Sequence, residues 1–143
     1  MIKLIYALLF SCFTLVSSGQ TKPDKDKEKI NAICDKLMQN FRDGKIPEAL
    51  QLLKQNSTID HSAVDSLQET MISQMNAILP SYGRILSYEF IREKKIKDFL
   101  AKRFYMLKLE KYFLKFDFTI YKSSTGWTIT NFTYNEDLIE VLN

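Results

Sequence analysis

The chain holds few residues of the kinds that do chemistry, and they are scattered. His61 is the only histidine, and it stands in Asp60-His61-Ser62, immediately before a segment with helical spacing. This setting is typical of a helix cap, and no Cys, His or Asp cluster with metal-ligand spacing surrounds it. The four glycines are isolated from one another, so the chain has no glycine-rich phosphate loop. We therefore predict no metal site, no cofactor and no catalytic residue.

Asp117 is the carboxylate that most resembles a general base, because it lies between Phe116 and Phe118. A general base needs a pocket that shields it and positions a substrate. From Leu114 to Tyr121, apolar residues alternate strictly with more polar ones, which is the pattern of a strand with one buried face. The alternation places Asp117 on the face opposite the apolar set, where we expect a solvated carboxylate.

Three polar residues are candidates for binding a small molecule, namely Arg103, Tyr105 and Asn131. By the same alternation they share the apolar face of the sheet, at its mouth, where they can orient a small hydrophobic or amphipathic ligand. A structural alternative stays open. Arg103 can lay its methylene stem on the apolar face with its head in water, and Asn131 can bond to the backbone.

These candidates belong to the second half of the chain, which alternates like strands, whereas the first half has helical spacing. We expect strands over residues 84–93, 99–110, 113–122 and 127–134. We expect three helices. The first carries the apolar stripe from Ile30 to Phe41, and the second begins at Pro47. The third begins at Ser62 and is stopped by Pro80 and Gly83. Residues 136–142 can form a closing turn of helix. Helices first and an antiparallel sheet second define an α+β fold.

The register between the two central strands decides which residues face the helices. A two-residue turn at Lys111-Tyr112 pairs Leu109 with Leu114, and a shift of one residue would bury Lys108 at a cost. The helix-covered face then carries Leu107, Leu109, Leu114, Phe116, Phe118, Ile120 and Ile129. The opposite face carries the apolar set Phe104, Met106, Tyr121, Phe132 and Tyr134. A contiguous set of this kind exceeds what a monomer usually exposes, so it predicts a homodimer interface.

Residues 1–19 have the pattern of a secretory signal peptide. Lys3 precedes an apolar run from Leu4 to Val16, and small residues stand before Gln20. The run is shorter than the ~20 residues needed to cross a bilayer. The alternative is a lipid anchor at Cys12, although Phe10 fits the required motif poorly. We expect export to a periplasm or secretion, a flexible leader over 20–28, a single domain over 29–143 and no membrane span after cleavage.

Cleavage changes the charge and the cysteine count of the mature chain. It removes one of 20 basic residues and none of 17 acidic ones, so the net charge falls from +3 to +2. Cys34 is then alone, which excludes a disulfide framework, and its place in the first apolar stripe predicts a buried hydrophobe. Basic and aromatic residues interleave over 84–122, but export argues against nucleic acid, and a half-exposed sheet explains the alternation.

The C-terminal half also carries a resemblance. Leu107-Lys108-Leu109-Glu110-Lys111, Phe116-Asp117-Phe118-Thr119-Ile120-Tyr121-Lys122, Gly126-Trp127 and Asn131-Phe132-Thr133-Tyr134 stand in the order of an NTF2-like (cystatin-like) domain. Over residues 25 to 143 the chain resembles small exported bacterial proteins of unknown function with this fold. The resemblance implies helices packed on the concave face of a curved four-stranded antiparallel sheet. The same fold hosts isomerases, hydratases, ligand binders and dimerisation modules, so function must be argued from the site.

Two hypotheses about function follow. The first is an exported, non-enzymatic binding or interaction module that forms a homodimer. The second is a small cofactor-independent enzyme that acts on a hydrophobic ligand in the concave pocket, with Tyr105 and either Arg103 or Asn131. Enzymes of the ketosteroid isomerase group, which resemble this fold, place an Asp in that pocket, and the outward position of Asp117 departs from them. A pocket plugged by Phe116, Phe118 and the methionines of the third helix would argue against an enzyme.

Overall fold

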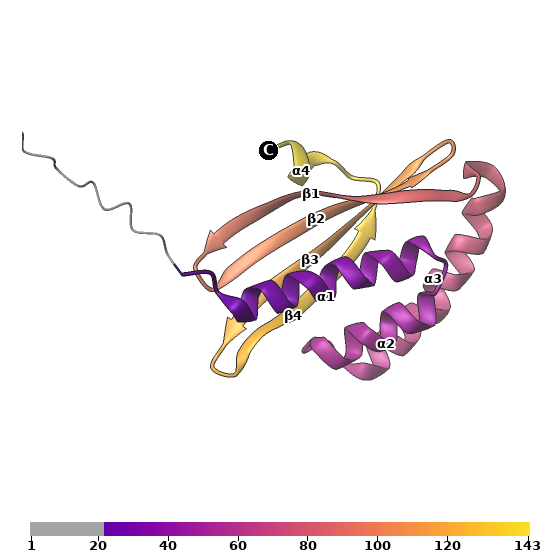
Figure 1. Ribbon diagram of the computed structural model, residues 1–143. Coiled ribbons are helices and arrows are strands. Elements are labelled where there is room, and N and C mark those ends of the chain that lie inside the picture. The colour runs from indigo at the N-terminus through magenta and orange to yellow at the C-terminus, as the bar shows by residue number, and fades with distance from the viewer. Residues whose placement is uncertain (1–21) are drawn as a thin grey trace, which may run out of the picture.

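The computed structural model describes residues 22–143, which form three helices followed by four strands and a final helical turn. The helices are α1 (Lys25–Arg42), α2 (Ile46–Asn56) and α3 (His61–Tyr82). The strands β1 (Ile85–Lys97), β2 (Leu100–Leu109), β3 (Phe113–Ser123) and β4 (Gly126–Asn135) precede α4 (Ile139–Leu142). The strands pair antiparallel in the order β1-β2-β3-β4 as a curved, open sheet, with α1, α2 and α3 on one side and α4 on the other (Figure 1). The predicted α+β fold is confirmed.

The predicted signal peptide over residues 1–19 and the alternative anchor at Cys12 lie outside the described residues. The predicted leader over 20–28 is too long, because α1 already begins at Lys25. Within residues 22–143, no helix combines the length and the apolar character that crossing a membrane requires.

Helix α1 begins at a side-chain cap and buries one apolar stripe. The Asp24 carboxylate accepts hydrogen bonds from the backbone N–H groups of Asp26 and Lys27, both at 3.2 Å, and so caps the first turn. Its apolar stripe is buried against the sheet and α2, and it consists of Ile30, Cys34, Leu37, Met38 and Phe41. Burial raises the pKa of Cys34 to about 12, so the thiol stays protonated and packs as a hydrophobe, as predicted.

Helix α3 starts at a cap and stops at a glycine. The Asp60 carboxylate accepts from the N–H groups of Ser62 at 2.9 Å and Ala63 at 3.2 Å, which confirms the capping role predicted for this segment. Gly83 ends the helix with φ of 80°, and a Cβ at this position would collide with Glu110. Pro80 lies inside the last turns and has no N–H to offer the carbonyl of Asn76.

The central register differs from the prediction by two residues. Leu107, not Leu109, lies opposite Leu114, and Tyr105 lies opposite Phe116. The turn is wider than expected because the N–H of Leu109 bonds to the carbonyl of Tyr112 at 2.8 Å. A shift of two residues leaves every side chain on its predicted face, since side chains alternate with a period of two. The predicted faces of β2 and β3 are therefore correct although their pairing was not.

Strand β4 contains a bulge that reverses the predicted face of its second half. Ile120 pairs with Ile129, but Thr119 pairs with Asn131, so Thr130 is an extra residue. Beyond the bulge, Phe132 lies opposite Phe118 and Tyr134 opposite Phe116, on the concave face. The prediction that Phe132 and Tyr134 face outward is wrong, and so is the prediction that Asn131 faces inward.

The edge strand β1 is longer than predicted and irregular. It continues to Lys97, through the segment that was expected to form a turn after Glu93. Its pairing with β2 shifts at three places, which leaves Leu86, Ile91 and Ile96 exposed. Bulges and charged side chains along an edge strand hinder pairing with another sheet.

The convex face is partly covered by the segment that ends in α4. Lys102 of β2 forms an ion pair with Glu140, and Arg92 Nη1 donates to the carbonyl of Val141 at 3.0 Å. Phe104 lies on this face as predicted, but it is fully buried, with the ammonium groups of Lys102 and Lys115 5.5 and 5.9 Å from its ring centre. Phe104 therefore has no surface left to offer a second protomer.

Candidate functional site

Arg103 and Tyr105, two of the three predicted ligand-binding residues, lie on β2 beneath α1. The Tyr105 hydroxyl donates a hydrogen bond to Asp35 Oδ1 at 2.6 Å. Arg103 donates to the same hydroxyl oxygen from Nε at 3.1 Å and from Nη2 at 3.0 Å. Both side chains are buried. Their polar groups bond to one another and to α1, whereas the prediction placed them at an open mouth.

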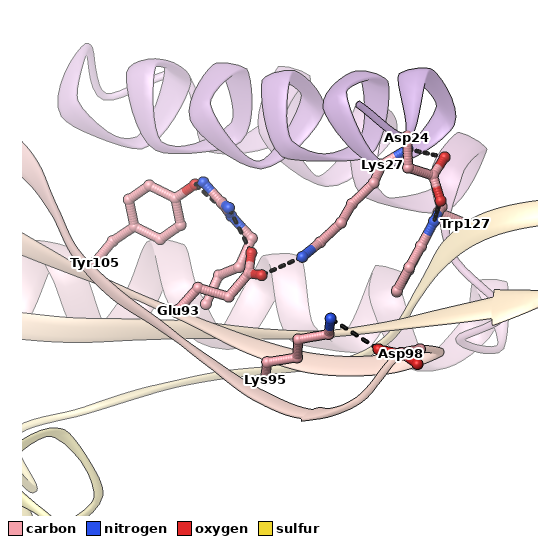
Figure 2. Close-up of polar contacts among 8 residues, drawn as sticks. Asp24, Lys27, Glu93, Lys95, Asp98, Tyr105 and Trp127 are labelled. Carbon is pink, nitrogen blue, oxygen red and sulfur yellow. Dashed lines mark hydrogen bonds and ion pairs between the residues drawn. The ribbon is translucent and has the colours of Figure 1, made fainter. Parts of the chain in front are cut away.

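Glu93 of β1 extends this cluster to the first turn of α1. Its Oε2 accepts from Arg103 Nη1 at 2.8 Å, and its Oε1 pairs with the Lys27 ammonium, which reaches down from α1 (Figure 2). Burial acts to raise the pKa of Glu93, but hydrogen bonds from Lys27 and Arg103 outweigh it, so the pKa lies below its ordinary value. Glu93 is thus an ionised carboxylate held between two cations.

The protonation of Tyr105 argues against a role as a general base at this position. Burial raises the pKa of Tyr105 far above its ordinary range, and the hydrogen bond that it donates to Asp35 acts in the same direction. The phenol stays neutral and cannot serve as a base. We call Lys27, Asp35, Glu93, Arg103 and Tyr105 the α1 network. Its contacts join α1 to β1 and β2, which is a structural task.

Asn131, the third predicted ligand-binding residue, does not join the other two. It is exposed on the convex face, opposite Thr119, because the bulge at Thr130 turns it outward. Strand β4 contributes Trp127 to the α1 end instead, where the indole Nε1 donates to Asp24 Oδ2 at 3.0 Å (Figure 2). The predicted three-residue site is therefore not assembled.

Asp117 lies on the convex face as predicted, but it is not solvated. Its side chain is 1% exposed, and it lies 3.3 Å from the Lys102 ammonium and 3.6 Å from that of Lys115. Thr133 Oγ1 donates to Asp117 Oδ2 at 2.7 Å. The carboxylate is buried and has two cationic partners. It lies on the opposite side of the sheet from both hollows described next.

Two hollows lie on the concave side at the other end of the sheet, beside the second half of α3. The first hollow has a volume of about 100 Å³. Its lining is almost wholly apolar and contains no ionisable side chain; it consists of Phe41, Gly44, Ile46, Met71, Met75, Asn76, Leu79, Ile85, Leu107 and Phe116.

A second hollow of about 350 Å³ lies on the opposite flank of α3, toward β3 and β4. It is lined by Gln74, Met75, Ile78, Tyr82, Leu114, Tyr134, Asn135 and Glu136. Met75 lines both hollows and is only 6% exposed, so its side chain stands between them. Methionine has three rotatable bonds and is a side chain that can move aside at low cost.

The two hollows were not predicted, and the sequence holds little that would have revealed them. Met71 and Met75 were predicted to be core residues, and they are buried as expected. Phe116 and Phe118 fill the middle of the concave face, where Phe41 stacks on Phe132 with ring centres 5.7 Å apart. What remains open depends on how closely α3 approaches the sheet, and no residue pattern reports that distance.

Over residues 22–143, no group of three or more His, Cys, Asp or Glu side chains is arranged to hold a metal ion. No family model, curated protein or solved structure matches this chain. Its function must therefore be argued from the geometry of its own residues.

Proposed function

We propose that this chain is an exported, non-enzymatic binding or interaction module of the NTF2-like class, whose site is the pair of hollows beneath α3. The ligand is a small hydrophobic or amphipathic molecule. The observation that carries the proposal is the lining of the first hollow, which is concave, apolar and free of ionisable side chains. Such a cavity holds an apolar group and has no acid, base or nucleophile with which to change it.

The alternative, a small cofactor-independent enzyme, needs a proton-transfer group facing its ligand. The groups predicted for that role, Arg103 and Tyr105, are bonded within the α1 network, and Asn131 lies on the other face. Glu136 at the second hollow is exposed and accepts a hydrogen bond from the Tyr112 hydroxyl at 2.6 Å. A solvated carboxylate of this kind favours recognition over catalysis.

Xenon tests the first hollow directly, because an apolar cavity of about 150 Å³ is known to hold xenon or benzene. As xenon pressure rises, we expect the methyl NMR signals of Met71 and Met75 to shift and the size of the shift to reach a plateau. The Leu79→Phe variant should abolish the shift, since Leu79 lines the hollow, whereas Leu67→Phe, on the same helix and lining neither hollow, should retain it. Methionine signals that ignore xenon in the wild-type chain would refute the proposed site.

We also propose a homodimer that forms through the convex face, with an interface whose residues differ in part from the predicted set. Of the predicted set, Tyr121 is 40% exposed on this face and Met106 is half-buried, while Phe104 is covered and Phe132 and Tyr134 lie inside. Phe99 packs edge-on against Tyr121 with ring centres 6.0 Å apart, and Ile139 and Leu142 of α4 are largely exposed. Exposed apolar groups of this size favour a partner surface.

Sedimentation equilibrium at micromolar concentration tests the dimer. We expect a dimeric mass for the wild-type chain and a monomeric mass for Tyr121→Asp, with unchanged thermal stability of the monomer. Thr119→Asp, on the same face of β3, is the matched control for the added charge. A monomeric wild-type chain would end the dimer proposal and leave the ligand proposal intact.

Export rests on the signal pattern of residues 1–19, which lie outside the described part of the chain. Expression of the full chain in a bacterial host, followed by N-terminal sequencing of the exported protein, should give Gln20 as the first residue. A lipid-modified Cys12 at the N-terminus would establish the anchored alternative.

A further inference from the structure

The second hollow differs from the first in its charge and in its aromatic rim. Tyr82, Tyr134 and Glu136 line it, and Tyr134 stacks on Phe116 with ring centres 5.7 Å apart. Tyr112 stacks on Tyr82 with ring centres 4.4 Å apart and donates its hydroxyl to Glu136 Oε2. The carboxylate is thus oriented by a tyrosine and keeps its second oxygen free of any hydrogen bond among residues 22–143.

Glu136 also lacks a cationic partner within the described residues, unlike many other carboxylates of the domain. Asp117 and Glu93 each have two cations close by, and Glu110 pairs with Arg84. A negative charge beside several aromatic rings is the arrangement that attracts an organic ammonium group, through Coulomb attraction and the negative potential of the ring faces. The hollow therefore favours cations and disfavours carboxylate-headed ligands.

The hollow also has an apolar floor that leads toward the first hollow. Ile78, Leu114 and Met75 form that floor, and beyond Met75 lies the ionisable-free cavity. An alkyl chain attached to an ammonium group would follow this floor, with Met75 turning aside to admit its end. The two volumes, about 350 Å³ and about 100 Å³, suit a bulky head and a thin chain in that order.

We propose that the hollows together bind a single-chain cationic amphiphile, with its ammonium group among Tyr82, Tyr134 and Glu136 and its alkyl chain directed beneath α3 toward the first hollow. This inference rests on the proposed binding function, and it adds the charge and the orientation of the ligand. It requires no reaction and no additional group.

Three probes with one chain and different heads test the charge preference. Octyltrimethylammonium, octanol and octanoate are titrated at 0.15 M salt while the methyl signal of Met75 is followed. We expect the cation to bind roughly tenfold more tightly than the anion, with octanol between them. Glu136→Gln should bring the three affinities within about threefold of one another. Glu69→Gln, an equal charge change on the exposed face of α3, should leave the preference as it is.

A second comparison tests the orientation of the chain. The Leu79→Phe variant narrows the first hollow, so it should weaken octyltrimethylammonium but leave tetramethylammonium, which has no chain, unchanged at Tyr82 and Tyr134. Leu67→Phe should affect neither probe. If both cations weaken equally, the chain does not enter the first hollow and the proposed orientation is wrong.

The failures of the two proposals are distinguishable. Equal binding of the three octyl probes would overturn the cation preference and leave the apolar site standing. Binding of xenon without any octyl probe would overturn the amphiphile and keep the small apolar cavity. Failure of xenon and of every octyl probe would remove the proposed function itself.

Discussion

The two ends of the concave face are built from the same sheet and covered by helices, yet they differ in kind. At the end covered by the first turns of α1, the α1 network joins helix and sheet through charged hydrogen bonds, and its central groups are buried. At the end covered by α3, the contacts are mostly apolar and two hollows remain. Polar residues on the concave face thus mark the hydrogen-bonded end at α1, and methionine and tyrosine mark the end with the two hollows at α3.

A buried polar cluster is evidence of a ligand-binding site only when space adjoins it. Directional hydrogen bonds fix the spacing of two elements. Apolar contacts lack such directionality, and the packing around Met75 leaves cavities that a ligand can complete. An aromatic layer lies between these two ends of the concave face.

The largest effect is expected for Phe132→Ala. Phe132 packs on Phe118 with ring centres 5.2 Å apart and on Phe41 at 5.7 Å, so its loss removes the layer that connects the two ends. We expect a loss of roughly 3–4 kcal/mol in the free energy of unfolding, measured by denaturant titration. Asn131→Ala, one residue away on the convex face, should change it by less than about 0.5 kcal/mol. Similar values for both variants would contradict the bulge at Thr130.

Arg103→Leu should come next, because it leaves Glu93 and Tyr105 without their shared cation. Removing one partner of a buried ion pair costs roughly 3 kcal/mol. Denaturant titration measures the loss, with Arg84→Leu as the control, since its side chain is 80% exposed and its pair with Glu110 is solvated. Xenon uptake by the folded variant should remain normal. A loss of uptake would show that the two ends are not independent.

A smaller and more discriminating effect is expected from two tyrosines. Tyr105→Phe removes the hydroxyl that receives two bonds from Arg103 and donates one to Asp35, which should cost about 1–2 kcal/mol. Tyr134→Phe removes a hydroxyl that donates to Gln74 at the exposed margin of α3, which should cost about 0.5 kcal/mol or less. The reverse order would mean that the α3 end is the more tightly bonded of the two.

The smallest effect concerns pH. The pKa of Glu93 is lowered in the folded chain from an ordinary value of 4.5, so its contribution to stability is complete above pH 4.5 and is lost as the pH falls through the folded pKa. The free energy of unfolding should therefore decline in acid, and Glu93→Gln should reduce that decline. Xenon binding at the first hollow should not depend on pH while the chain stays folded, because no ionisable group lines it.

Much of the fold could be predicted, because it follows from local periodicity. The stripe from Ile30 to Phe41 and the alternation from Leu114 to Tyr121 each assign a buried face by themselves. The register error between β2 and β3 changed no face, since the period of a strand makes shifts of two residues indistinguishable in the pattern. The error in β4 did change faces, because one inserted residue at Thr130 reverses the alternation and leaves no signature in composition.

The candidate site was less predictable. Arg103 and Tyr105 were correctly placed on the concave face, but the strand pattern does not show which side chains of the helices lie opposite them. Asp35 and Lys27 come from α1, far away in the sequence, and they turn two candidate ligand-binding residues into a structural cluster. Glu136, predicted only as part of an acidic closing turn, acquires significance from its position beside Tyr82 and Tyr112.

The amino-acid sequence by itself determined the order of helices and strands, the buried stripe of each and the burial of Cys34. These properties depend on neighbours within a few residues, where periodicity, capping and burial act. Only the tertiary structure decided which polar groups are satisfied, which face Phe132 takes and where space remains. Those properties depend on distances between elements that meet only in the folded chain. The pair Lys27–Glu93 therefore joins helix and sheet at one end of the sheet, and the Glu136 carboxylate becomes a candidate recognition group at the other.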